Sequence, residues 1–97
     1  MSKVITPTVG RIVWFRPKRT DNIFRDGLSA DQPFSAMIIY VHSDRKVNLV
    51  VVGHTGFHWM RPETLLIQPG DDRPQVGDIN FCEWMPYQVG HYSMGFL

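Results

Sequence analysis

The sequence predicts an all-β protein that folds as one small barrel domain over residues 1–97. Its apolar residues come in short runs rich in β-branched and aromatic side chains, and clusters of Gly, Pro and Asp separate these runs. The 3.6-residue period of an amphipathic helix is almost absent. A chain that is 43% hydrophobic and 20% charged has the composition of a folded globular domain, and its length allows a modest core.

Six runs are expected to form strands, which suits a closed small barrel. They cover residues 10–16, 33–43, 46–54, 57–62, 64–68 and 78–85. Residues 17–33 are bounded by prolines and rich in turn formers, so we expect a long, flexible loop there. One strand, a long loop and then strands joined by tight turns is the order of an SH3-like barrel of five to six strands, with an OB-like barrel as the alternative. Residues 88–97 are expected to form a C-terminal tail.

A tight hairpin is expected where Asp44 and Arg45 separate two long apolar runs. Side chains alternate along a strand, so both faces of this hairpin are apolar and each needs a cover. We expect either the long loop or another subunit to cover the second face, and we favour a homodimer or higher oligomer. The expected strand partners are Ser43 with Lys46, Tyr40 with Leu49, and Ile38 with Val51.

The segments 7–15 and 74–82 read "PTVGRIVWF" and "PQVGDINFC" and share Pro, Val, Gly and Ile at the same offsets. In each, Pro and Gly are expected to set a bend that starts a strand. We expect Ile12 and Ile79 to point inward, with Trp14 and Phe81 following on the same faces.

The stretch "GHTGFHWMRPE" holds two histidines, but a two-residue turn after His54 would place His58 on the opposite face of the hairpin. Two ligands that point apart cannot bind one ion, so we expect neither a metal nor another cofactor. Trp59 and Arg61 share one face, either as a packing pair or as a platform for a ligand. The single cysteine, Cys82, excludes an intramolecular disulfide and is expected to be buried.

Motifs of catalysis and of membrane insertion are not found in the sequence. There is no phosphate-cradling glycine pattern, no nucleophile elbow and no paired-carboxylate spacing, so we expect a protein that is not an enzyme. No run reaches the roughly 18 apolar residues of a membrane helix, and the N-terminal region lacks the pattern of a signal peptide. We therefore expect a cytoplasmic protein without a membrane partner.

Charge is distributed unevenly along the chain. Residues 1–25 carry six cationic and one anionic side chains, and the remainder carries four and eight. Cations that hold phosphates beside aromatic rings that stack on bases are typical of nucleic-acid binding. A pI near 8.0 is low for that role, so nucleic-acid binding is the second hypothesis and protein interaction the first. The candidate binding residues are Trp14, Arg16, Lys18, Arg19, Arg25, Trp59 and Arg61.

In their order along the chain, "PTVGRIVWF", "VNLVVVG" and "CEWMP" resemble a group of small bacteriophage and prophage proteins that have no established activity. The resemblance spans residues 7–86, and its opening stretch is the specific part. The ending "EWMPYQVGHYSMGFL" departs from the pattern. The resemblance implies a phage-encoded accessory protein in a bacterial cytoplasm: a host-takeover, defence-countering or minor structural factor. It implies no catalytic residues.

Overall fold

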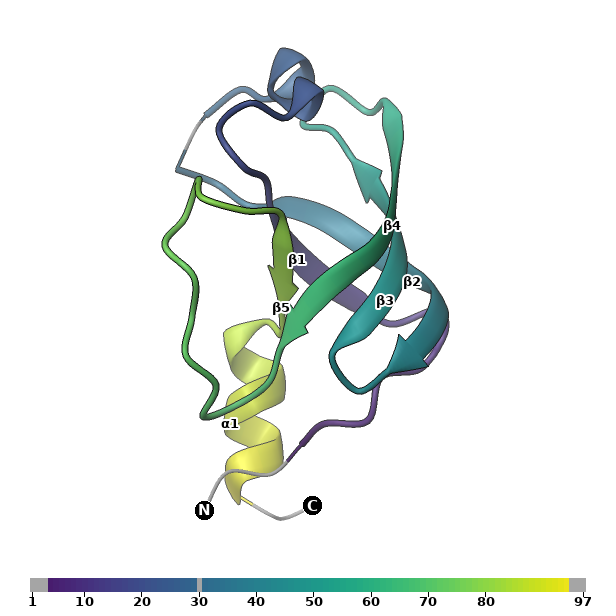
Figure 1. The fold of residues 1–97 in the computed structure, drawn as a ribbon, viewed down its shortest axis with the longest axis vertical. Coiled ribbons are helices and arrows are strands. Elements are labelled where there is room, and N and C mark those ends of the chain that lie inside the picture. Colours follow the sequence, from purple (N-terminus) through teal and green to yellow (C-terminus); the bar gives the residue numbers. More distant parts are fainter. Residues whose placement is uncertain (1–3, 30, 95–97) are drawn as a thin grey trace.

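The computed structural model describes residues 4–29 and 31–94, and it confirms a small all-β barrel. Within this part of the chain, five strands close the barrel in chain order, and η1 and α1 lie at opposite ends of it (Figure 1). The elements are β1 (Ile12–Arg16), η1 (Asn22–Asp26), β2 (Phe34–Ser43), β3 (Lys46–Val52), β4 (His58–Ile67), β5 (Phe81–Glu83) and α1 (Pro86–Met94).

The barrel closes through a parallel pair, β4 with β5. The strands from β1 to β4 alternate in direction and β5 is antiparallel to β1, so β5 must run parallel to β4. Parallel neighbours need a long crossover, and residues 68–80 supply it (Figure 1). Ion pairs hold this crossover against the rest of the barrel: Arg45–Asp71 at 2.8 Å, Arg73–Glu83 at 2.7 Å and Arg19–Asp78 at 3.0 Å.

The β2–β3 hairpin turns at Asp44 and Arg45 and pairs Ser43 with Lys46, as predicted. The other two predicted pairs are wrong, because two irregularities in β2 each shift the register by one residue. Such bulges bend a strand and increase its twist, which helps a short sheet to close. The observed partners are Ile38 with Leu49, and Tyr40 with Asn48.

The predicted strands 57–62 and 64–68 are a single strand, β4, with a bend inside it. The bend lies at Glu63, whose φ of 47° is in the left-handed region. The register against β3 shifts at this point. Asn48 on β3 stabilises the bend, since its side-chain oxygen accepts the Glu63 N–H at 2.8 Å. Pro62 and Glu63 therefore interrupt the pattern of the strand without ending it.

The side chains of β1 that point into the core are on the opposite face from the predicted one. Val13 and Phe15 are fully buried, whereas Ile12 is 38% exposed and Trp14 is half-buried. The inward prediction for Ile12 is therefore wrong, and Ile79, 44% exposed and outside β5, is also not a core residue. The buried apolar residues are Ile5, Val13, Phe15, Ile23, Phe34, Ala36, Ile38, Val47, Leu49, Val51, Leu66, Phe81, Cys82 and Trp84.

Cys82 is buried in β5 as predicted. Burial raises the pKa of its thiol, and the nearby Glu83 charge raises it further. The neutral thiol lies 3.5 Å from the carbonyl oxygen of Leu65. Cys82 therefore behaves as a small apolar side chain of the core and not as a nucleophile.

Gln68 closes the end of the barrel near α1 with its side-chain amide, although it is only 1% exposed. Its oxygen accepts the Ile5 N–H at 2.9 Å and the Trp84 indole N–H at 3.2 Å. Its nitrogen donates to the carbonyl oxygens of Ile5 at 2.9 Å and Asp44 at 2.7 Å. One buried amide thus connects the N-terminal segment, the β2–β3 turn and the chain after β5.

The predicted tail at 88–97 falls largely in α1, a helix that the sequence analysis did not predict; residues 95–97 lie outside the described part. Pro86 occupies the first helical position, where its missing N–H costs nothing. Gln88 reaches back to accept the Met85 N–H at 2.7 Å, as in a capping box. None of the helices described by the structure is long and apolar enough to cross a membrane.

Candidate interaction surface

An apolar row crosses the outside of four neighbouring strands. The observed register places Ile12 of β1 opposite Met37 of β2, Met37 opposite Val50 of β3, and Val50 opposite Met60 of β4. Since side chains alternate between the two sides of a sheet, these four share the outer side. Met37 is 40% exposed and Met60 59% exposed. The row is therefore a continuous apolar stripe in contact with solvent.

The neighbouring row is also uncharged. It runs from Trp14 through Ser35 and Val52 to His58, with Trp14 and Val52 half-buried. The bulge in β2 adds Ile39 and Tyr40 to the same side. We call this set the outer face, and none of its side chains is an acid, a lysine or an arginine: Ile12, Trp14, Ser35, Met37, Ile39, Tyr40, Asn48, Val50, Val52, His58 and Met60.

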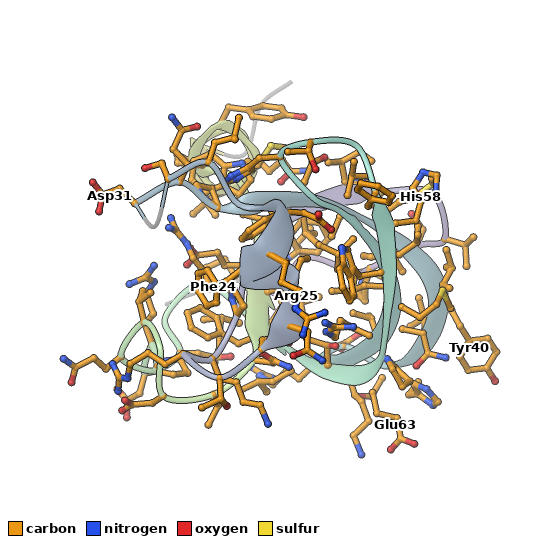
Figure 2. The ribbon with its side chains drawn as sticks, turned by 90° about the horizontal axis from the view of Figure 1, so that it is seen from above. Phe24, Arg25, Asp31, Tyr40, His58 and Glu63 are labelled. Carbon is orange, nitrogen blue, oxygen red and sulfur yellow. The ribbon has the colours of Figure 1, made fainter. Side chains whose placement is uncertain are left out.

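Figure 2 shows Tyr40 and His58 pointing away from the barrel on the side of β2 to β4. Tyr40 is 55% exposed, and its ring lies edge-on to that of His42 with the centroids 4.8 Å apart. Residues 17–29 and 31–33 of the long loop do not cover this side, because η1 lies over one end of the barrel (Figure 1). Of the two predicted covers for the second face of the hairpin, the loop is therefore excluded.

The loop at 17–33 is held down on the barrel end, partly by two of the predicted binding residues. The Arg61 guanidinium donates hydrogen bonds to both carboxylate oxygens of the buried Asp21 side chain. The Trp59 indole N–H donates to Asp26 at 2.6 Å. The Arg61 guanidinium lies 5.6 Å from the centre of the Trp59 ring. The sequence predicted this pair as packing or as a ligand platform, and the structure uses it as an anchor for the loop.

The start of η1 shows why the chain turns there. The Asp21 side chain accepts the Ile23 N–H at 2.8 Å and so acts as the N-cap of η1. Ile23 is fully buried and closes the barrel beneath the turn. At the end of η1, the absence of a side chain at Gly53 lets Asp26 approach the backbone of the β3–β4 turn closely, since an added Cβ would lie 2.5 Å from the Cβ of Asp26. Residues 21–26 of the long loop are therefore packed as a lid over the core.

Acid should destabilise the protein, because three paired carboxylates have lowered pKa values. Burial raises the pKa of Asp21 and of Glu83, but arginine partners outweigh it, together with the Ile23 N–H in the case of Asp21. Hydrogen bonds from Arg45 lower the pKa of Asp71. A carboxyl whose pKa is lower in the folded state stabilises the fold above its unfolded pKa, about 4, and loses that contribution as pH falls further. We expect the urea midpoint to fall as the pH drops below about 4. A midpoint unchanged down to pH 3 would contradict this.

The predicted basic residues do not form one free cationic surface. Arg16 pairs with Glu83 at 3.0 Å and lies over the Trp14 ring at 5.6 Å, and Glu83 also holds Arg73. Arg19 pairs with Asp78. The other two, Lys18 and Arg25, form no ion pair within residues 4–29 and 31–94. Arg25 lies on η1 with Phe24 (Figure 2), whereas Arg16 belongs to β1.

Oligonucleotide binding is expected to be weak for this reason. Cations that already neutralise carboxylates release few counterions from a phosphate backbone. The affinity for oligonucleotides should therefore be low, and it should fall further as the salt concentration rises. We expect fluorescence anisotropy with single- and double-stranded oligonucleotides to show no binding near 150 mM salt. Binding at that salt which disappears in the double variant Lys18→Ala, Arg25→Ala would favour the nucleic-acid hypothesis instead.

His54 and His58, the two histidines beside the β3–β4 turn, lie in different surroundings. The turn is longer than predicted: Val52 pairs with His58, and Gly53 N–H donates to Phe57 O at 2.7 Å. His54 is stacked on the ring of Phe34, with its Nδ1 accepting the Leu28 N–H at 2.8 Å and its Nε2 3.1 Å from a carbonyl oxygen. Among the side chains that the structure describes, no group of three or more His, Cys, Asp or Glu could hold a metal ion.

Comparisons with protein families, with curated proteins and with solved structures find no match to this chain. The candidate surface is therefore defined by its own geometry. The sequence predicts that the hairpin is apolar on both faces and includes Trp14 of the outer face among the candidate residues, but Ile12 of β1 and Met60 of β4 are not in that set. The missing information was which face of β1 turns inward.

Proposed function

We propose that this protein is a non-enzymatic interaction module that binds another protein through its outer face. The observation that carries the proposal is the uncharged row Ile12, Met37, Val50 and Met60, in register across four strands and open to solvent. Exposed apolar patches of this kind mark interaction sites in soluble proteins, since removing apolar surface from water on binding is favourable. The sequence resemblance adds the setting: a phage or prophage protein that acts in the bacterial cytoplasm on a host or phage protein.

The chemistry of the surface describes the partner. An interface core is depleted in charge and enriched in aromatic residues and methionine, and the outer face has Trp14, Tyr40, Met37 and Met60. The flexible thioethers adapt to an irregular opposing surface. The partner surface should therefore be apolar and uncharged at its centre, with polar groups at its rim.

A charge placed in the middle of the outer face tests the proposal. We expect the tagged protein to retain a partner from a lysate of bacteria that also express the untagged chain, identified by mass spectrometry. Met37→Asp should lose it, because an aspartate would be buried there without a cation. Gln75→Asp is the matched control: it adds the same charge at an exposed position of the crossover and should retain the partner. Equal retention by both variants, with both folded by circular dichroism, would contradict docking on this face.

A further inference from the structure

We infer that the outer face binds a second copy of this chain, so that the protein is a face-to-face homodimer. The inference rests on the proposed function, since it names the partner of the same surface. In a dimer with a twofold axis both subunits contribute the same patch, and the patch must therefore be complementary to itself. The outer face meets that condition in its charge, its polar groups and its shape.

Charge is the first requirement. A twofold axis brings each side chain near its own copy, so a patch with one dominant charge would repel itself. No side chain of the outer face is an acid, a lysine or an arginine, although 20% of the chain is charged. The charged side chains on the outer side of the barrel strands lie at the borders of the face: Arg16 with Glu83 on one side, and Lys46 with Glu63, 3.9 Å apart, on the other. Arg61 of β4 instead pairs with Asp21 at the barrel end. These borders would form the polar rim of the dimer.

Two polar side chains of the face can pair with their own copies. The hydroxyls of Ser35 and Tyr40 each donate and accept a hydrogen bond, so each can bond to the same group of a second copy. Both side chains are exposed, Tyr40 at 55%. A contact between two copies would therefore leave no unpaired charge at its centre and could satisfy both of these hydroxyls.

Shape is the third requirement, because two barrels meet along convex surfaces. Rigid side chains would touch only along a line, whereas long flexible ones can fill the space beside it. Met37 and Met60 are the two most exposed side chains of the apolar row, at 40% and 59%. Each has three rotatable bonds and a polarizable sulfur, which suits it to fill such gaps.

Sedimentation velocity over a concentration series tests the dimer directly. We expect the full chain to sediment as a dimer that dissociates on dilution, and Met37→Asp to weaken self-association at least about tenfold, since two aspartates would be buried near the axis. Gln75→Asp should behave like the wild type. Met60→Asp provides a second disruption on a different strand, so that misfolding of one variant does not decide the result.

Two outcomes would overturn the dimer. Wild-type protein that stays monomeric up to millimolar concentration excludes it, and a dimer that persists in both Met37→Asp and Met60→Asp uses a different surface. The proposed function fails separately. If the wild type is monomeric but captures a foreign protein that Met37→Asp does not, the outer face is a docking site whose partner is not a second copy.

Discussion

Replacing Gln68 with leucine is expected to lower the free energy of unfolding by about 3 to 5 kcal/mol. Leucine fills nearly the same volume, so the loss comes from hydrogen bonds and not from a cavity. The Ile5 N–H and the Trp84 indole N–H would lose their acceptor, and the carbonyl oxygen of Ile5 its donor, at a position where Gln68 and Ile5 are each 1% exposed. Each buried polar group left without a partner costs about 1 to 3 kcal/mol.

Urea unfolding followed by tryptophan fluorescence measures this loss. The control is Gln75→Leu, which makes the same exchange at an exposed position and should change stability by no more than about 0.5 kcal/mol. If Gln68→Leu is as stable as the control, the amide does not hold the end of the barrel together. The free energy of unfolding of a small domain is about 5 to 15 kcal/mol, so the expected loss would leave this domain only marginally stable.

Replacing Arg61 with methionine is expected to cost about 2 to 4 kcal/mol and to release the lid at 21–26. The Asp21 side chain is 4% exposed and that of Arg61 19%, so the variant leaves a buried carboxylate without its cation. The double variant with Asp21→Asn removes the stranded charge and keeps a cap for the Ile23 N–H. It should be more stable than Arg61→Met alone at pH 7.

The pH dependence separates lost charge compensation from lost packing. Without Arg61, burial is the main influence on the pKa of Asp21 and raises it, so protonation favours the folded state. The stability gap between wild type and Arg61→Met should therefore narrow as pH falls through about 4. A gap that is constant from pH 7 to 3, or a double variant no better than the single one, would show that packing alone is responsible.

Much of the barrel could be predicted from local sequence. Runs of β-branched residues marked the strands, and the two residues Asp44 and Arg45 could form nothing longer than a tight turn. The bulges in β2 could not be predicted, because the apolar pattern is continuous through Ile38 and Tyr40 and does not show which residue is left unpaired. The start of α1 had a readable signal in Pro86 followed by Gln88, but the following residues lack helical periodicity.

The candidate surface depended on one ambiguity. In β1 both alternating sets are apolar, so periodicity cannot decide whether Ile12 and Trp14 or Val13 and Phe15 fill the core. The closed barrel decides it through the pairing of β1 with β2, which places Phe15 opposite the buried Phe34. In the hairpin, the prediction that both faces are apolar is confirmed, and a cover for its outer face stays a prediction. Trp59 and Arg61 were identified as a pair, but their carboxylate partners are distant in sequence and could not be found from it.

Hydroxyl-radical footprinting of the methionines tests most directly whether the outer face is an interface. Met37 and Met60 lie on it, and the half-buried Met85, just before α1, lies off it and serves as an internal control. Oxidation is measured by mass spectrometry on the same sample, dilute and concentrated. We expect Met37 and Met60 to be oxidised readily in dilute protein and protected in concentrated protein, while the oxidation of Met85 is unchanged. If Met37 and Met60 are each oxidised to the same extent in dilute and in concentrated protein, and the protein also captures no partner from a lysate, the outer face is not an interface.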